Sequence, residues 1–439
     1  MGMGLNLTDT IMAGNLSALD LAGVAIGNSL YIPIVVFCFA VMHAITPIVG
    51  EHLGARRFFE IGKSARQLFW LVLMLATPAF FIIRNVSLLM EWVGVTQEII
   101  PVADGYLKAI SWGTLFILLF AGFRNFSEGL GVARPAMYIT ASSIIINIGA
   151  NYVLMYGKFG LPALGAVGTG YASSIVHLYV ALMLFLFLRG FKPFKRFHIF
   201  ARTRGPEWKY IKDIVDVGLP NGISTVLEVL LFASVSLLMG KLSTQAAASH
   251  QIAINVAATM FMIPMGLSMA ISQRVGFSIG QGSVPLARYR GFHGIAIGTL
   301  CMIFTALLLL IFPDLIVSVY TKDQIVRDLA SSLLFMAAIF QISDGLQVGA
   351  FGALRGLKDT RIPMVFNLIA YWFVGFPVGY FLGMHTDMGP RGLWMGLIAG
   401  LSIAAVLHNY RFHLLTKKKS GKRVNSNVEG KHYIEADVN

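Results

Sequence analysis

Three carboxylates lie inside long apolar stretches of the sequence, where an acid is costly. Asp9 lies in TDTIMAG, Glu228 in STVLEVLLF and Asp344 in QISDGLQ. A charged side chain at the centre of a bilayer costs about 2.5–3.5 kcal/mol on insertion scales, and by default it marks an ion or proton path. An acid that snorkels or serves packing alone is the open alternative for each residue taken singly. We therefore expect these acids to bind a cation or a proton.

Amide side chains recur near the acids at helical spacing. Asn147 and Asn151 are four residues apart, as are Gln251 and Asn255, so each pair shares one helix face. Their oxygens, beside carboxylates, suit a hard cation such as Na⁺. Helix-to-helix hydrogen bonding is an equally good explanation for any single amide. His250 is predicted to be an interfacial residue near a helix start.

The composition is that of a polytopic membrane protein. Hydrophobic residues make up 56% of the 439 positions and charged residues 13%, with mean hydropathy +0.72, whereas soluble domains carry about 25% charge. The net charge of +13 lies in the breaks between apolar blocks and at the C-terminus, which indicates contact with a membrane surface and not with nucleic acid. Cys38 and Cys301 lie in apolar surroundings, so we expect free thiols and no disulfide or metal site.

Enzyme signatures are absent from the sequence, which has no HExxH, GxSxG, P-loop or CxxC motif. The sequence therefore predicts a protein that is not an enzyme and has no cofactor. Without a nucleotide site, any pumping must draw its energy from an ion gradient.

Apolar blocks of spanning length, roughly 20 residues, recur along the whole chain. We predict an all-α fold with twelve transmembrane helices, at residues 1–14, 20–48, 64–86, 100–124, 136–157, 162–189, 210–240, 246–278, 290–313, 326–354, 362–384 and 390–415.

The basic residues are distributed unequally between the two sides of these helices. Only seven of the 34 Lys and Arg fall on the side opposite the loops 49–63, 190–209 and 355–361, namely Arg84, Lys108, Lys158, Lys241, Lys322, Arg327 and Arg391. Since cytoplasmic loops carry the excess of Lys and Arg, we expect a multi-pass protein of the inner membrane with both termini in the cytoplasm.

The chain contains an internal repeat, the mark of many transporter folds. Matching residues recur 226 to 228 positions apart: Gly14 to Ser17 (GNLS) with Gly240 to Ser243 (GKLS), Val49-Gly50 with Val275-Gly276, Gly54 with Gly280, Gly129 with Gly356, Arg134-Pro135 with Arg361-Ile-Pro363, and Gly168 with Gly396. We predict two pseudo-symmetric six-helix lobes, at 1–189 and 210–415. A basic cytoplasmic loop at 190–209 joins them, and a basic, disordered tail occupies 416–439.

The repeat predicts that the first helix is shortened. The seventh helix runs about thirty residues to Gly240, but its counterpart ends at Gly14. About 14 residues at 1.5 Å each cannot cross roughly 30 Å of hydrocarbon. We expect either a start assigned too far downstream or a truncated copy.

Four motifs resemble the multidrug and toxic compound extrusion (MATE) family in its bacterial NorM-type branch. They are TDTIMAG at 8–14, AAASHQIAINV at 246–256, MIPMGLSMAISQRVGFSIGQG at 262–282 and ALRGLKDTRIPMVFNLIAYWFVGFPVGY at 353–380. The resemblance extends to about Leu415. It implies V-shaped lobes around a central cavity and export of cationic drugs in exchange for Na⁺ or H⁺.

The resemblance also implies roles for single residues. Asp9 is similar to a first-helix acid that handles protons or substrate, faced by Asn147 and Asn151. Glu228 and Asp344 are similar to the acids that bind the coupling cation, Na⁺ above all, and Gln251 matches a polar partner near them. We add Asn255 and Tyr371 as supporting candidates. The expected partners are cationic drugs and membrane lipid, and the expected assembly is a monomer.

Two other functions are weighed against drug efflux. A flippase for lipid-linked oligosaccharides shares the two-lobe design, but it would need basic residues for a pyrophosphate, and the spans carry acids instead. A channel or receptor is the second alternative.

Overall fold

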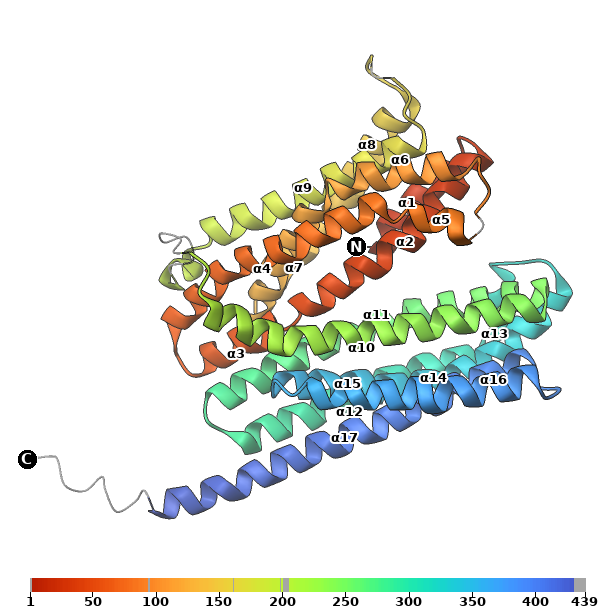
Figure 1. The fold of residues 1–439 in the computed structure, drawn as a ribbon. Coiled ribbons are helices and arrows are strands. Elements are labelled where there is room, and N and C mark those ends of the chain that lie inside the picture. The colour runs from red at the N-terminus through yellow and green to blue at the C-terminus, as the bar shows by residue number, and fades with distance from the viewer. Residues whose placement is uncertain (1, 94, 161, 198, 200–204, 430–439) are drawn as a thin grey trace, which may run out of the picture. The chain divides into compact units, whose positions relative to one another are not determined.

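The structure, a computed structural model, describes residues 2–93, 95–160, 162–197, 199 and 205–429. These described residues form helices and no strands (Figure 1). They divide into two compact units: unit 1 holds 1–49 and 57–222, and unit 2 holds 50–56 and 223–439. The predicted lobe limits at 189 and 210 stay a prediction.

The described part of the chain up to residue 197 contains ten helical elements. They are α1 (Gly2–Gly14), α2 (Ala18–Met42), α3 (Ile45–Gly54), α4 (Phe58–Asn85), α5 (Leu88–Val93), α6 (Ile100–Ser111), α7 (Thr114–Gly129), α8 (Arg134–Tyr156), α9 (Ala166–Gly190) and the 3₁₀ helix η1 (Lys192–Phe197). α9 packs against α6, α7 and α8, and α1 packs against α2 and α8.

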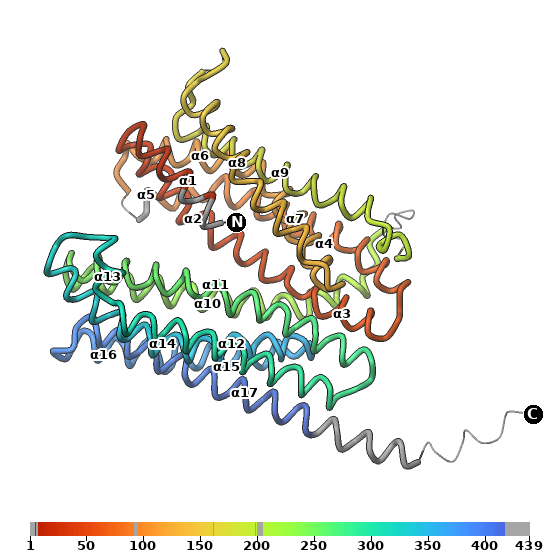
Figure 2. Tube along the Cα trace, turned by 180° about the vertical axis from the view of Figure 1, so that it is seen from behind, coloured from red at the N-terminus to blue at the C-terminus, as the bar shows by residue number. Residues whose placement is uncertain are grey.

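The second part of the chain contains nine helical elements. They are α10 (Trp208–Leu242), α11 (Thr244–Gly280), α12 (Val284–Ile311), α13 (Pro313–Ser318), α14 (Gln324–Gly356), α15 (Arg361–Leu368), the π-helix η2 (Ile369–Gly375), α16 (Phe376–Met384) and α17 (Pro390–Glu429). α14 packs against α11, α12 and α17, so it is the central helix of unit 2 (Figure 2). α14 therefore has neighbouring helices of unit 2 along much of its surface.

The predicted number of spans, twelve, is not confirmed. Among the described residues, ten helices are long and apolar enough to cross a membrane, or eleven if the bent pair α6 and α7 is one span. The predicted first span corresponds to α1, which has 13 residues and falls below spanning length. The helices predicted at 136–157 and 362–384 are present, and in the structure they begin at Arg134 (α8) and Arg361 (α15).

The bend between α6 and α7 was not predicted. The two helices meet at 49°, at a break that contains Gly113. A Cβ on Gly113 would lie 2.6 Å from His177 Nδ1 and 2.9 Å from Ser174 Cα on α9. The close approach of α9 therefore requires glycine at this position.

The last helix extends further than predicted. α17 continues past residue 415 to Glu429, and the sequence between them contains no proline that would end it. Residues 430–439 of the predicted disordered tail lie outside the described residues.

Residues related by the repeat pack against each other within unit 2. A Cβ on Gly54 would lie 2.0 Å from Phe277 O, and a Cβ on Gly280 would lie 2.0 Å from Glu51 O. The two glycines therefore allow the backbones of α3 and α11 to come into direct contact. Beside this crossing, Lys358 Nζ lies 2.7 Å from Glu51 Oε2, so the loop after α14 is tied to the end of α3.

Candidate functional site

Asp9 is the centre of a buried polar cluster in unit 1. Its side chain is 1% exposed. Oδ1 accepts hydrogen bonds from Asn151 Nδ2 at 2.7 Å and from Asn147 Nδ2 at 3.1 Å. Oδ2 accepts one from Ser173 Oγ at 3.1 Å. The structure thus brings together the three predicted residues of this cluster and adds Ser173.

The helices position these donors by their spacing. Asn147 and Asn151 lie one turn apart on α8, and Asn151 Nδ2 also donates to Asn147 Oδ1 at 3.3 Å. α8 and α9 both pack against α1, so their polar faces meet at Asp9. All the donors are neutral, and no salt bridge reaches Asp9 among the described residues. The negative charge of an ionised Asp9 is therefore available to a cation or a proton.

Asp344 lies on the buried face of α14 with a glutamine on either side. Gln341 and Gln347 precede and follow it by three residues, so all three side chains share one face. They are 0–3% exposed. Gln341 Oε1 accepts from Thr305 Oγ1 of α12 at 2.6 Å, and Gln347 Nε2 donates to the Tyr371 hydroxyl at 2.7 Å.

Three polar atoms of this cluster are unpaired. Asp344 Oδ1, Gln347 Oε1 and Gln341 Nε2 are buried and have no hydrogen-bond partner among the described residues. A buried polar atom without a partner typically costs about 1–3 kcal/mol, and more if it is charged. Two of the three atoms are oxygens that could each bind a cation.

Glu228 is the second acid of this cluster. It lies half-buried on α10, within electrostatic range of Asp344 and Tyr371. The Trp372 indole donates to Leu227 O at 3.2 Å, which fixes the backbone just before Glu228. The structure therefore brings together the predicted residues Glu228, Asp344 and Tyr371.

Tyr371 and Trp372 lie on η2, a π-helical turn of the kind found often at functional sites. Pro377 follows within α16 and cannot donate to the carbonyl one turn back. The wider π-helical turn changes the directions in which consecutive side chains point. Tyr371 contacts α14, and Trp372 contacts α10.

The side chains of Gln251 and Asn255 form a hydrogen bond with each other and not with the residues of this cluster. Gln251 is exposed, and its amide donates to Asn255 Oδ1 at 3.2 Å. His250 lies six residues from the start of α11 and is 1% exposed, and its interfacial position stays a prediction. Its Nδ1 accepts from the Trp394 indole at 3.2 Å, and its Nε2 lies 3.0 Å from Ser236 Oγ.

Four residues of the two clusters were missed from the sequence. Gln341 and Gln347 carried a usable signal, because both lie three residues from an acid inside a span. Ser173 and Thr305 carried none, because single hydroxyls are common in membrane helices.

The donors available to a cation in unit 2 are carboxylate and neutral oxygens. Among the described residues, no three His, Cys, Asp or Glu side chains gather as a metal site would require. Carboxylate, amide and hydroxyl oxygens are the ligands that hard cations prefer, whereas transition metals prefer nitrogen and sulfur ligands.

Many spans with acids buried inside them define a multi-pass membrane transporter. The MatE family model matches residues 3–153 and 220–381. The chain belongs to the MATE family, whose members are transporters and not enzymes.

Similar proteins and structures support this assignment. The multidrug resistance protein MdtK of Yersinia enterocolitica is 39% identical over 95% of this chain and 92% of its own length. MdtK of Yersinia pseudotuberculosis is 38% identical over 94% and 92%. The fold is similar to the crystal structure of the eukaryotic MATE transporter AtDTX14, with TM-score 0.85 and 20% identity over 95% and 94% of the chains. It is also similar to an outward-facing MATE multidrug transporter, with TM-score 0.85 and 18% identity over 95% and 92%.

Proposed function

We propose that this protein exports cationic amphiphilic drugs and dyes from the cell in exchange for Na⁺ or H⁺. The observation that carries the proposal is the unpaired Oδ1 of Asp344, buried on the central helix of unit 2 beside the unpaired Oε1 of Gln347. A buried carboxylate oxygen without a donor favours binding of a cation.

The drug substrate is inferred from the relatives and the charge of the clusters. The Yersinia relatives are named multidrug resistance proteins. Asp9, Glu228 and Asp344 are acids, and no salt bridge neutralises them among the described residues. Acids of this kind suit a cationic ligand and disfavour the pyrophosphate of a lipid-linked oligosaccharide.

Na⁺ is the favoured coupling ion. A proton needs one oxygen, whereas Na⁺ is held by several. Asp344 Oδ1 and Gln347 Oε1 are both unpaired. The carboxyl group of Glu228 is within electrostatic range of Asp344. Two acids with a free amide oxygen therefore form a better site for Na⁺ than for a proton alone.

The transport cycle follows from competition for negative charge. In the outward-facing protein, Na⁺ or a proton binds at Glu228 and Asp344, and drug is released. In the inward-facing protein the ion leaves, and the emptied carboxylates favour binding of the next cationic drug. The ion gradient supplies the energy. Asp9, with its neutral donors, serves as a second proton or substrate site.

The inner membrane is the proposed location, with both termini in the cytoplasm. The unequal distribution of Lys and Arg between the two sides of the spans supports this orientation.

The test is dye transport by purified protein in liposomes, with Na⁺ and H⁺ gradients imposed separately. We expect ethidium to be concentrated against its gradient when Na⁺ is the driving ion. A channel would only equilibrate the dye, and a flippase for lipid-linked sugars would ignore it. Either of these two results would refute the proposal.

A further inference from the structure

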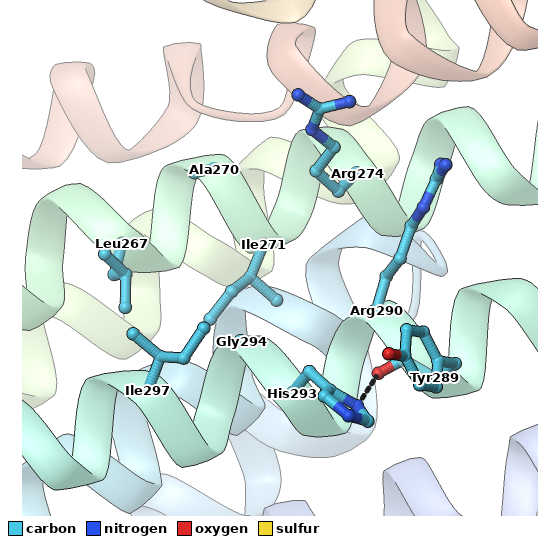
Figure 3. Close-up of a pocket in the computed structure, with 9 residues that line it drawn as sticks. All are labelled: Leu267, Ala270, Ile271, Arg274, Tyr289, Arg290, His293, Gly294 and Ile297. Atoms are coloured by element: carbon cyan, nitrogen blue, oxygen red, sulfur yellow. Dashed lines mark hydrogen bonds between the residues drawn. The ribbon is translucent and has the colours of Figure 1, made fainter.

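A pocket of about 390 Å³ opens between α11 and α12, and none of the acids described above lines it (Figure 3). Its floor is apolar and is formed by Leu267, Ala270, Ile271, Gly294 and Ile297. Gly294 lets Ile271 of α11 pack directly against α12, because a Cβ there would lie 2.4 Å from Ile271 Cγ1. The pocket has the size of a small ligand site, at the lower end of the usual 300–1,000 Å³.

One end of the pocket is strongly basic. Arg274 of α11 and Arg290 of α12 line it, together with Tyr289 and His293, and none of the lining residues is acidic. Arg274 is exposed, and its guanidinium makes no hydrogen bond or salt bridge among the described residues. Arg290 Nη1 donates only to a neutral partner, Ser278 Oγ, at 3.0 Å. Within the part of the chain that the structure describes, no carboxylate pairs with either guanidinium.

The basic and apolar parts are separated along the helices. Arg274 lies six residues, about 9 Å, from the end of α11 at Gly280, and Leu267 lies about 10 Å further from that end. On α12, Arg290 is near the start and Ile297 is about 10 Å further in. Figure 3 shows the same order, with Leu267 and Ile297 at one end of the pocket and the two arginines at the other.

The basic end lies at the depth of lipid headgroups. α11 has 37 residues, about 55 Å, whereas a bilayer with its headgroups is about 40–45 Å thick. Residues about 9 Å from the helix end therefore lie close to the headgroups. Gly280 also contacts Glu51, which pairs with Lys358, so this is the end of unit 2 with the basic loop 355–361.

We propose that this pocket binds an anionic phospholipid of the cytoplasmic leaflet. The phosphate lies against Arg274 and Arg290, and the first carbons of one acyl chain lie along Leu267 and Ile297. Basic pockets between membrane helices on the cytoplasmic side are suited to anionic headgroups. The basic end of the pocket matches the phosphate of a phospholipid, and the apolar end matches its acyl chain. The positive charge of the basic end also disfavours binding of the cationic drugs of the proposed function.

The test is lipid binding by the full-length protein, purified in detergent and stripped of lipid. Dioleoylphosphatidylglycerol and dioleoylphosphatidylcholine are titrated separately while bound lipid is counted by native mass spectrometry. We expect phosphatidylglycerol to bind more tightly. Arg274→Gln and Arg290→Gln should each weaken its binding about fivefold, the equivalent of about 1 kcal/mol for each basic residue near the surface.

Two further variants separate a built pocket from general attraction. Ala270→Trp fills the apolar floor without changing the charge and should abolish tight binding of phosphatidylglycerol. Arg134→Gln removes an exposed charge at the start of α8 and should leave binding unchanged. Unaltered binding in Ala270→Trp, or an equal loss in Arg134→Gln, would overturn the proposal. Saturable competition by inorganic phosphate at millimolar concentration would assign the site to a free anion and would also overturn it.

Discussion

Asn151 Nδ2 lies 2.7 Å from Asp9 Oδ1, which joins two helices that are 142 residues apart in the sequence. Asn147 and Ser173 complete the set of donors around this carboxylate. Burial of a carboxylate without hydrogen-bond donors would cost free energy of folding. Here three neutral donors bond to the carboxylate of Asp9. The stability of unit 1 should therefore depend on these contacts.

Replacement of Ser173 by Ala should destabilise the protein by about 1–3 kcal/mol, because Asp9 Oδ2 loses the donor at 3.1 Å. The measurement is thermal unfolding in detergent. Ser174→Ala is the matched control, since the neighbouring hydroxyl donates to Ala109 O and not to the acid. In an Asp9→Asn background the Ser173→Ala cost should shrink, because the two residues are coupled. An unchanged cost there would show that Ser173 acts independently of Asp9.

Replacement of Tyr371 by Phe should remove the acceptor of Gln347 Nε2 and leave a buried amide donor unpaired. We expect a loss of about 1–3 kcal/mol in stability and a weaker apparent affinity for the coupling ion, since Gln347 is no longer held beside Asp344. Ion-dependent dye efflux measures the second effect. Tyr380→Phe, at a position 42% exposed, controls for loss of a hydroxyl. Equal behaviour of the two variants would argue against a role for Tyr371.

Gly54→Ala should be strongly destabilising. Its Cβ would lie 2.0 Å from Phe277 O, so two helix backbones would have to separate, and overpacking of this kind costs about 1–3 kcal/mol or more. Gly266→Ala is the control, because a Cβ there meets nothing within 4 Å. Thermal unfolding of both variants checks the prediction. Similar melting temperatures would mean that the crossing of α3 and α11 is looser than described.

Much of the fold could be predicted from the sequence, because bilayer thickness sets helix length and apolar runs reveal the spans. The helices predicted at 136–157 and 362–384 begin in the structure within two residues of the predicted starts, at Arg134 and Arg361. The bend at Gly113 could not be predicted, since its cause is the approach of Ser174 and His177 from a distant helix. Periodicity contains no information about such contacts.

The candidate site could be predicted in part. The acids were found because a carboxylate in an apolar run is rare and costly, and Asn147 and Asn151 because they share a face. The burial of His250 was missed because its partner, Trp394, is 144 residues away. Gln251 was placed near the acids by resemblance, whereas the structure bonds it to Asn255. Its proposed role in ion binding stays a prediction.

The most direct test of the account is Na⁺-driven ethidium transport by Asp344→Asn in proteoliposomes. Asp328→Asn is the matched control, since that acid lies on the same helix but is exposed and bonded to Gln324. The account predicts that Asp344→Asn folds and inserts normally but transports no faster than empty liposomes, while Asp328→Asn retains full activity. Normal Na⁺-driven transport by Asp344→Asn would contradict the central claim that this carboxylate couples the ion to the drug.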